Sequence, residues 1–318
     1  MGAEPDVVVW DVPLRTRFRG LTRRDGVLVR GDAGWGEFSP FWDYDDDAAV
    51  RWWRAAREAA DEGWPAAVRT HVPVNVTVPA VDPEHAHRIV TGSGGCRTAK
   101  VKVAEPGQPT GADEARLEAV RDALGPHGAI RIDANAAWDV DTATERLAAL
   151  DRAAGGLEYA EQPVPGVDDL VALRRRTHVP LAADEAVRRT DDPLEVVRRH
   201  AADVIVLKVQ PLGGVRACLR LAEQAGLPVV VSSALESSVG LAAGLALAAA
   251  LPELPYACGL ATAALLADDL VPDPLLPRDG AIDVRRPVPS AALLRAAAAP
   301  PSLVARWDAR LAAVRARA

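Results

Sequence analysis

Five side chains that could transfer protons or bind a metal ion follow one another along this chain at nearly regular intervals. They are Lys102, Asp133, Glu161, Asp184 and Lys208, and successive members are 31, 28, 23 and 24 residues apart. Each closes a short apolar run rich in β-branched residues, which is the pattern of a buried strand. Such an interval accommodates one helix and the next strand, so we expect five consecutive strand ends.

Lysine is rare in this chain, and its positions coincide with that series. Of 37 Lys and Arg residues, three are lysine: Lys100, Lys102 and Lys208. Arginine keeps its proton in proteins, whereas a desolvated lysine can lose it. We therefore interpret the lysines as positions where an amine exchanges a proton. The alternative, an Arg-rich composition with three scattered lysines, does not explain why all three lie at the ends of β-like runs.

The three carboxylates predict a metal site. The carboxyl ends of strands in a closed parallel barrel open onto one face, where Asp133, Glu161 and Asp184 would meet. Clustered carboxylates repel one another unless a cation neutralises them. A set of oxygen ligands without Cys or His suits Mg²⁺ rather than Zn²⁺. Taken singly, each carboxylate is better interpreted as a helix cap or a loop charge, so the prediction rests on the ordered series.

A lysine on either side of the metal ligands suits removal of a proton next to a carboxylate. We predict that Lys102 is the base. Lys100 lies two residues earlier on the same face of the strand, where its charge would lower the pKa of Lys102. Fixed positive charges would stabilise the resulting enediolate.

The chain from residue 74 onward alternates strand-like and helix-like segments, which predicts parallel βαβ units. Eight strand candidates favour closure into an α/β barrel. An open doubly wound sheet is the alternative, but no G-x-G-x-x-G follows the first strands. The candidates are residues 74–78, 99–103, 130–133, 157–161, 181–184, 204–208, 229–232 and 256–258.

The first 73 residues have a different pattern and predict a separate α+β unit. Short strands at 7–10, 26–30 and 33–36 would form an antiparallel meander, with turns at Asp25-Gly26 and Gly31-Asp32. Residues 45–62 look helical, with acidic residues at the start. Six of the eight tryptophans lie in this unit, and we expect them mainly in its core.

The composition of the chain limits the classes of partner and the kinds of site that we expect. The formal net charge of −7 argues against nucleic acid or an anionic membrane surface as a partner. Three widely spaced cysteines form neither a disulfide framework nor a zinc motif. The N-terminus does not look like a signal peptide, and the Ala/Leu-rich residues 241–251 are too short to span a bilayer. We expect a cytoplasmic protein that binds a small anionic molecule. A monomer is our expectation, although the sequence leaves the oligomeric state open.

Five short motifs of this chain, in their order, resemble the enolase superfamily in its muconate-lactonising-like branch. They are K-x-K, D-x-N, E-x-P, D-E and a late lysine. The resemblance covers nearly the whole chain. It implies a modified (β/α)7β TIM-type barrel of residues 74–284. An N-terminal α+β capping domain, residues 1–73, would be completed by residues from about 285 to 318. It also implies that Asp133, Glu161 and Asp184 bind Mg²⁺, or Mn²⁺ in its place, and that Lys102 and Lys208 are the acid/base lysines.

Within that superfamily, residues 34–40, 131–138, 208–214 and 231–240 are similar to the o-succinylbenzoate synthase family of menaquinone biosynthesis. The implied reaction is a carbon–oxygen lyase step. It is the Mg²⁺-dependent syn dehydration of 2-succinyl-6-hydroxy-2,4-cyclohexadiene-1-carboxylate to 2-succinylbenzoate through an enediolate. Lys102 would remove the proton α to the ring carboxylate and return it to the departing hydroxyl. Lys208 would remain cationic.

Several residues have less specific expected roles. Arg131 and Asn135, with Lys100, would support the metal or substrate, although a structural role suits Arg131 and Asn135 equally. The backbone amides of Ser232, Ser233 and Gly259 would hold the succinyl carboxylate, or these residues form ordinary turns. The Arg-rich residues 14–24 would be a flap over the site, or a solvated loop.

Three other functions stay open at the level of sequence. A racemase of N-succinylamino acids or a dipeptide epimerase would use both lysines as bases, although no Asp-x-Asp lies near residues 256–259. A lactonising enzyme of the same branch is a second alternative. A non-catalytic barrel that binds a small anion belongs to another class, and the intact five-residue series weighs against it.

Overall fold

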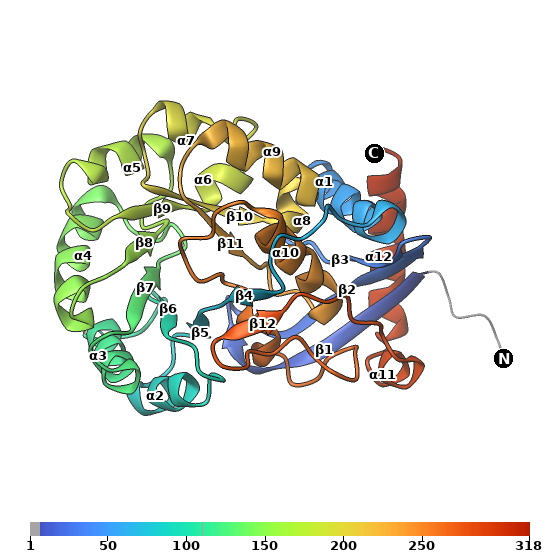
Figure 1. Cartoon of the computed structure of the whole chain (residues 1–318), viewed down its shortest axis with the longest axis horizontal. Coiled ribbons are helices and arrows are strands. Elements are labelled where there is room, and N and C mark those ends of the chain that lie inside the picture. The colour runs from blue at the N-terminus through green and yellow to red at the C-terminus, as the bar shows by residue number, and fades with distance from the viewer. Residues whose placement is uncertain (1–6, 110) are drawn as a thin grey trace.

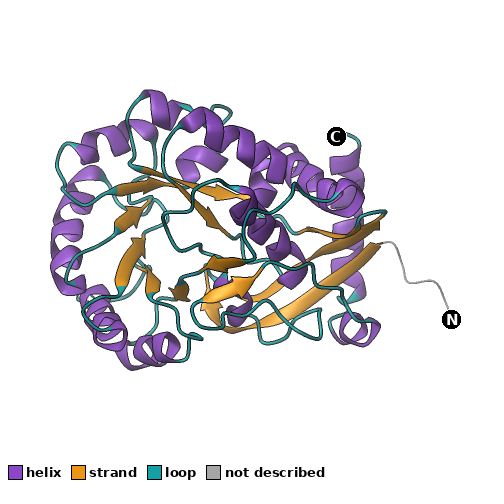
Figure 2. Ribbon diagram, in the orientation of Figure 1, coloured by secondary structure: helices purple, strands orange, loops and turns teal. Residues whose placement is uncertain are grey.

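A computed structural model describes residues 7–109 and 111–318. A curled parallel sheet forms one part of the molecule, and helices surround its outer face (Figures 1 and 2). Seven strands lie side by side in the order β11-β10-β9-β8-β7-β6-β5, so each strand pairs with its neighbours in sequence. They are β5 (Val76–Val78), β6 (Thr98–Lys102), β7 (Ala129–Asp133), β8 (Tyr159–Glu161), β9 (Leu181–Ala183), β10 (Val204–Lys208) and β11 (Val229–Ser232).

The eighth expected strand, residues 256–258, does not form a full strand. It closes the ring through isolated bridges, from Val74 to Cys258 and from Ser232 to Gly259. Gly259 permits the close approach, because a Cβ there would lie 2.5 Å from Ser232 Oγ. The sheet is therefore a TIM-type barrel with one reduced edge, and the expected fold class is confirmed.

Helices connect successive strands, as the alternating pattern predicted. Asp139, for example, caps α4 by accepting a hydrogen bond from the Thr142 amide, and left-handed Gly155 ends that helix. The helices are α2 (Pro83–Thr91), α3 (Ala112–Leu124), α4 (Val140–Ala154), α5 (Val167–Arg174), α6 (Glu185–Arg188), α7 (Glu195–Arg198), α8 (Val209–Leu212), α9 (Val215–Ala225), α10 (Ser238–Ala250) and the 3₁₀ turn η2 (Ala261–Leu265).

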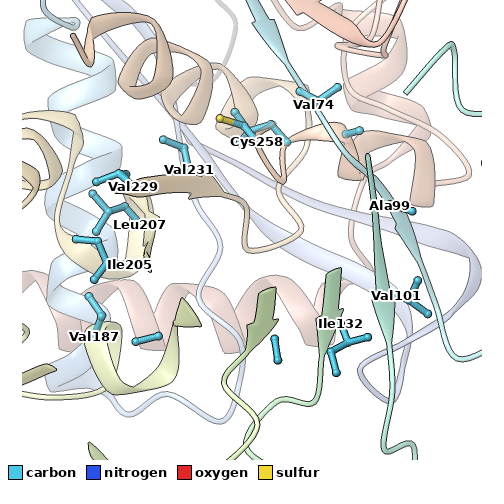
Figure 3. Packing of buried hydrophobic residues seen from close by; sticks show 14 of the residues in the cluster. Val74, Ala99, Val101, Ile132, Val187, Ile205, Leu207, Val229, Val231 and Cys258 are labelled. Carbon is cyan, nitrogen blue, oxygen red and sulfur yellow. The ribbon is translucent and has the colours of Figure 1, made fainter. Parts of the chain in front are cut away.

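Alternate residues of each barrel strand face opposite environments. Outward side chains such as Val101, Ile132, Leu207 and Val231 pack in the main hydrophobic core (Figure 3). The inward positions hold a smaller apolar cluster that includes Tyr159. Because side chains alternate with period two, the lysines and carboxylates that end the strands point inward above this cluster.

The N-terminal unit is a three-stranded antiparallel meander of β1 (Val7–Phe18), β2 (Leu21–Gly31) and β3 (Gly34–Phe38). The predicted turn at Asp25-Gly26 is wrong, because Gly26 lies within β2 opposite Trp10. The turn falls instead at Arg19-Gly20, both with positive φ. Gly26 is needed for close packing, because a Cβ there would lie 2.6 Å from Ser39 Cβ and 3.0 Å from the Trp10 ring.

Helices cover the outer side of the meander. The expected helix over residues 45–62 is found as α1 (Asp46–Arg57), continued by the π-helical turn η1 (Glu58–Glu62). Beside α1 lies the C-terminal helix α12 (Pro301–Arg315), preceded by α11 (Ala291–Ala296) (Figure 1). A small ladder of β4 (His71–Pro73) and β12 (Ala281–Asp283) joins the segments near the predicted domain boundaries.

Trp307 of α12 lies at the centre of the N-terminal unit's core. Its ring packs edge-on against Phe38 and close to Trp42, and its Nε1 donates a hydrogen bond to Asp25. The side chain is fully buried. The last helix therefore contributes core to a unit formed otherwise by the first 62 residues. The described residues include no helix that is both long enough and apolar enough to cross a membrane.

We predict that Trp307→Ala lowers the free energy of unfolding by about 3–5 kcal/mol, because it empties a large buried site. Urea denaturation followed by far-ultraviolet circular dichroism measures this change. Asp308→Ala, at the exposed neighbouring position, is the control and should change stability by less than about 0.5 kcal/mol. Equal effects of the two substitutions would show that the C-terminal helix is not part of this core.

Candidate active site

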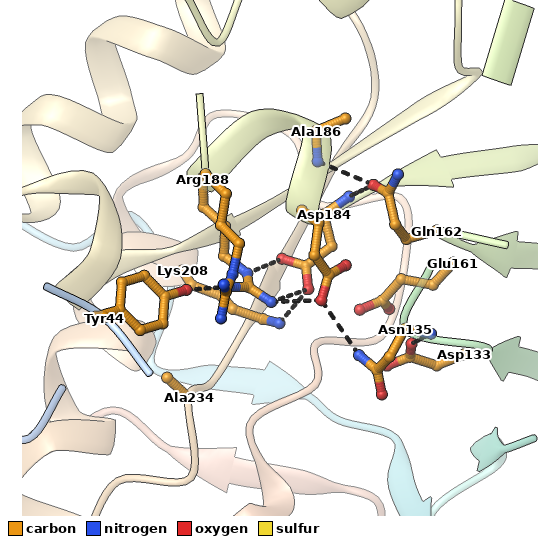
Figure 4. Close-up of polar contacts among 12 residues, drawn as sticks. Tyr44, Asp133, Asn135, Glu161, Gln162, Asp184, Ala186, Arg188, Lys208 and Ala234 are labelled. Atoms are coloured by element: carbon orange, nitrogen blue, oxygen red, sulfur yellow. Dashed lines mark hydrogen bonds and ion pairs between the residues drawn. The ribbon is translucent and has the colours of Figure 1, made fainter. Parts of the chain in front are cut away.

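The structure brings the predicted series together at one end of the barrel, and Figure 4 shows how Asp133, Glu161, Asp184 and Lys208 lie there. Lys102 pairs in register with Asp133, and Asp133 with Glu161, across β6, β7 and β8. Asp184 directly follows β9, and Lys208 ends β10 opposite Ser232. This arrangement places the five side chains at the same level of the barrel, although the first and the last are 106 residues apart in the sequence.

Each carboxylate is bonded to at least one lysine. Lys100 Nζ donates to both oxygens of Glu161 at 2.9 and 2.8 Å and to Asp133 Oδ2 at 3.2 Å. Lys102 Nζ donates to Asp133 and, at 2.7 Å, to Asn135 Oδ1. Lys208 Nζ donates to Asp184 Oδ2. The three carboxylates are at most 1% exposed, so they are shielded from water, whereas the Lys102 side chain is 12% exposed.

Asp184 has a second cationic partner, Arg188 of α6. The Arg188 guanidinium donates to both oxygens of Asp184, at 2.8 and 3.1 Å, and also bonds to Glu185 and to Tyr44 Oη. Gln162 holds the Asp184 and Ala186 amides through its Oε1, each at 3.0 Å. Because Tyr44 belongs to the N-terminal unit, Arg188 links that unit to a predicted metal ligand.

Burial and neighbouring charges shift the pKa values of these groups in different directions. Burial lowers the pKa of Lys102 to about 8, with Asp133 opposing the shift and Lys100 adding to it. The pKa of Lys100 lies above its usual range, because Glu161 and Asp133 outweigh the effect of burial. The lysine with the lowered pKa is thus the predicted base, although desolvation contributes more than the Lys100 charge that we expected.

The carboxylates respond to their partners in the same way. Although burial raises the pKa of each carboxyl, Lys102 and Lys100 hold that of Asp133 below its usual range. Arg188 and Lys208 do the same for Asp184. Burial and the Asp133 charge raise the pKa of Glu161. Glu161 is therefore the carboxylate with the least compensation from nearby cations.

The donor set suits a divalent cation in its chemistry, since Asp133, Glu161 and Asp184 offer only oxygen. In the described residues, however, no three or more His, Cys, Asp or Glu side chains are grouped so that they could hold a metal ion. The lysine and arginine groups instead occupy the carboxylate oxygens. A metal ion would therefore require these side chains to exchange partners.

A small cavity of about 30 Å³ lies above the cluster. The barrel contributes the predicted residues Lys102, Lys208 and Ser232 among others, and the N-terminal unit contributes Phe18, Arg19 and Phe41. The Phe18 ring lies 5.4 Å from Lys102 Nζ. The expected flap, residues 14–24, is a hairpin tip in the structure, and its turn covers this cavity.

Ser232, Ser233 and Gly259 all line the cavity, but not in the expected manner. The Ser233 amide donates to Gly259 O at 3.1 Å, and the Gly259 amide donates to Val231 O at 2.8 Å. The bridges that close the barrel thus use both amides, so the expectation that they are available to a carboxylate is wrong. Ser233 Oγ bonds to Thr262 Oγ1 at 2.7 Å.

The supporting residues Asn135 and Arg131 have different surroundings. Asn135 contacts Lys102 and donates to Glu185 at 3.3 Å, so it belongs to the cluster. Arg131 is fully buried lower in the barrel, where it bonds to Glu158, Asn75 and the Ala257 carbonyl. We considered a role in the site and a structural role for Arg131, and these contacts favour the structural role.

Sequence reasoning missed several residues of the site, among them Phe41, Tyr44 and Arg188. Arg188 lies four residues after Asp184 at helical spacing, and this spacing could have indicated an ion pair. Phe41 and Tyr44 come from a loop of the N-terminal unit, and nothing in their local sequence indicates which part of the barrel they contact.

Comparison with known proteins defines the family. Residues 83–289 match the enolase C-terminal domain-like family, and residues 9–60 match the enolase N-terminal domain-like family. The chain is 64% identical to an o-succinylbenzoate synthase of Thermobifida fusca, over 96% of this chain and 94% of that protein. This chain belongs to the o-succinylbenzoate synthase family of the enolase superfamily. An o-succinylbenzoate synthase of Mycolicibacterium smegmatis is 52% identical over 95% of the chain and 92% of that protein.

Solved structures support the same fold. Muconate lactonizing enzyme from Pseudomonas fluorescens has a TM-score of 0.78 at 22% identity, over 92% of this chain and 97% of that one. An isomerase from Streptomyces coelicolor has a TM-score of 0.73 at 26% identity, over 95% of this chain and 97% of that one. The family matches and the o-succinylbenzoate synthase relatives confirm the predicted superfamily, its muconate-lactonising-like branch and the synthase family.

We predict that Arg188→Met lowers the free energy of unfolding by about 3–5 kcal/mol, because it leaves the buried Asp184 charge with one cation fewer. Urea denaturation measures the change. Arg189→Met is the matched control, since the ion pair of Arg189 with Asp43 is about half exposed and should be worth less than about 1 kcal/mol. If both substitutions cost the same, Arg188 does not stabilise the buried cluster.

Proposed function

We propose that this chain catalyses the o-succinylbenzoate synthase reaction with Lys102 and Lys208 as its catalytic lysines. The observation that carries the proposal is that the two lysines line one cavity from β6 and β10. Three strands separate β6 from β10 in the sheet order. In a closed barrel that spacing puts the lysines on opposite sides of the mouth, where they could flank a bound ring.

Lys102 would act on the carbon that bears the ring carboxylate. Its lowered pKa allows the neutral amine to exist near neutral pH. The amine takes the proton, and the electron pair moves into the enediolate. The ammonium then protonates the hydroxyl on the adjacent ring carbon, which leaves as water while the ring becomes aromatic. One proton and one hydroxide leave the substrate, and Lys102 returns to its starting state.

Lys208 would stabilise the enediolate by its charge. It is buried, and its ion pair with Asp184 fixes the ammonium beside the cavity. A fixed cation in a site without water stabilises developing negative charge more than a solvated cation would. A single base suffices for a dehydration, so Lys208 need not transfer a proton.

We further propose that Asp133, Glu161 and Asp184 hold a divalent metal ion, Mg²⁺ or Mn²⁺ in its place. When bound, the ion would neutralise the substrate carboxylate as negative charge develops on it. The raised pKa of Glu161 supports this proposal, since burial and the Asp133 charge outweigh the effect of Lys100 on that carboxyl. Lys100, which bonds to both Glu161 and Asp133, would keep the two carboxylates together before the ion arrives.

Binding of the substrate between Lys102 and Lys208 would require the N-terminal hairpin to move. The cavity of about 30 Å³ is close to the volume of one water molecule, far below that of a substituted six-membered ring. Phe18 and Arg19 at the hairpin tip form its cover. We propose that this tip opens to admit the anionic substrate and closes to exclude water.

We predict that Lys102→Arg lowers kcat by about 10²–10⁴-fold, because arginine keeps the charge but cannot act as a base. Ultraviolet absorbance of the aromatic product, measured with Mg²⁺ present, follows the reaction. Lys208→Arg is the matched variant: since only its charge is required, it should lose at least tenfold less activity than Lys102→Arg.

The reverse order of these losses, or equal losses, would contradict the assigned roles. Wild-type protein that leaves the cyclohexadiene substrate unchanged but exchanges the α-proton of N-succinylamino acids in D₂O would indicate a racemase. Mg²⁺ binding without either reaction would indicate an enzyme that acts on another carbon acid, or a protein that only binds a small anion.

We predict that Glu161→Gln weakens Mg²⁺ binding at least about tenfold, since losing a ligand should cost no less than losing a partner of a ligand. Isothermal titration calorimetry measures the affinity without reference to turnover. Glu158→Gln removes a carboxylate from the same segment that bonds to Arg131 instead, and it should leave the affinity unchanged. Equal affinities of Glu161→Gln and wild type would exclude Glu161 as a ligand.

A further inference from the structure

Two glutamates of the N-terminal unit cap helices of the barrel. Glu37 of β3 accepts hydrogen bonds from the Ser237 and Gly240 amides at the start of α10, each at 3.2 Å. Glu58 of η1 accepts from the Val215 and Arg216 amides at the start of α9, at 2.5 and 3.1 Å. A carboxylate at a helix N-terminus satisfies free N–H groups and interacts favourably with the helix dipole.

Both helices have a glycine where the glutamate approaches. A Cβ at Gly240 would lie 2.8 Å from Glu37 Cδ, and a Cβ at Gly214 would lie 2.3 Å from Glu58 Oε2. These glycines belong to the segments 208–214 and 231–240. Their close approach to a carboxylate of the other unit gives both segments a role in docking the two units.

Glu37 differs from Glu58 in its connection to the active site. Glu37 Oε1 accepts from Ser39 Oγ at 2.7 Å, and Gln210 in turn bonds to the Ser39 amide at 3.1 Å and to Ser39 Oγ at 3.3 Å. Gln210 lies two residues after Lys208. Ser39 lies two residues before Phe41, which lines the cavity. Glu37 thus connects the segments that carry a catalytic lysine and a cavity wall.

Arg24 extends this network to the loop after β11. The buried guanidinium donates to the Leu235 carbonyl at 3.1 Å and to the carbonyls of Ser39 and Ala234. Leu235 has a left-handed φ of 63°, which a non-glycine residue adopts only when its surroundings hold it there. The loop that begins with Ser232 and Ser233 is therefore fixed to the N-terminal unit at both Arg24 and Glu37.

Burying the Glu37 carboxylate costs free energy of folding. Glu37 is 2% exposed, and burial raises its pKa to about 7 although Ser237 and Ser39 bond to it. An apolar side chain could fill the space without this cost. The carboxylate is nevertheless the group that can accept from the donors of Ser39, Ser237 and Gly240 together.

We propose that Glu37 is a positioning residue for the reaction: through Ser39 and Gln210 it sets the place of Lys208, and through Ser237 and Gly240 that of the loop beside the cavity. Glu58 docks the two units without this connection. The kinetic consequence rests on the proposed function, whereas the structural consequence does not.

The experiment compares Glu37→Leu, Glu37→Gln and Glu58→Leu. Glu37→Leu should lower kcat by about 10²-fold, the effect of a displacement of about 1 Å in a catalytic group, and change KM less than kcat. Glu37→Gln keeps one acceptor and should recover most of the loss. Glu58→Leu should lower the midpoint of thermal unfolding while kcat stays within about twofold of wild type. Gln210→Met serves as a second test of the same connection should Glu37→Leu not fold.

Hydrogen–deuterium exchange gives a readout that does not depend on turnover. Glu37→Leu should speed amide exchange in residues 209–212 and 237–241. Glu58→Leu should speed amide exchange in residues 215–219 alone. If wild-type protein fails to convert the cyclohexadiene substrate, the proposed function is wrong and the exchange pattern alone decides this inference. Unchanged kcat and unchanged exchange at 209–212 in Glu37→Leu, or equal kcat losses in the two leucine variants, would overturn it.

Discussion

Burial of opposite charges at the mouth of a closed barrel constrains the rest of this structure. The three carboxylate residues, Lys100 and Lys208 are each at most 5% exposed. Removing a charge from water costs several kcal/mol unless a partner is placed accurately. Each ion therefore needs its counterion at bonding distance, and in-register strands provide that accuracy. A shift of β6 by one residue relative to β7 would turn both lysines away from the interior.

The same constraint explains why two units meet at this point. A barrel alone would leave the strand ends open to solvent, where water would screen the charges. The N-terminal unit covers them with Phe18 and Phe41 and supplies Tyr44 to Arg188. It is held in place by carboxylates that cap barrel helices. The cover and the charged cluster are thus parts of one arrangement, although they come from different parts of the sequence.

Local patterns predicted what depends on local physics. Alternation of strands and helices indicated the barrel, and polar residues that end apolar runs indicated Lys102, Asp133, Glu161, Asp184 and Lys208 as neighbours. The prediction of a turn at Asp25-Gly26 failed because Gly26 is a glycine that leaves space for the Trp10 ring. In the local sequence such a glycine looks the same as a turn glycine. The prediction that the Ser233 and Gly259 amides are available to a carboxylate failed because the bridges that close the barrel use both amides. Contacts of Glu37, Phe41 and Tyr44 depend on how two units dock, and no periodicity encodes that.

The division between charged and apolar surfaces fits the energetics of the proposed reaction. Aromatisation favours loss of water, so the difficult step is removal of a proton next to a carboxylate. Positive charge is needed where that carboxylate would lie, and Lys102 and Lys208 would flank it from opposite sides of the mouth. The phenylalanines on the opposite wall exclude water and offer a surface to a ring, and exclusion of water strengthens the field of the cations beneath them. Each unit thus supplies the part that its structure can build: rigid strand ends hold the charges, and a hairpin tip provides the cover.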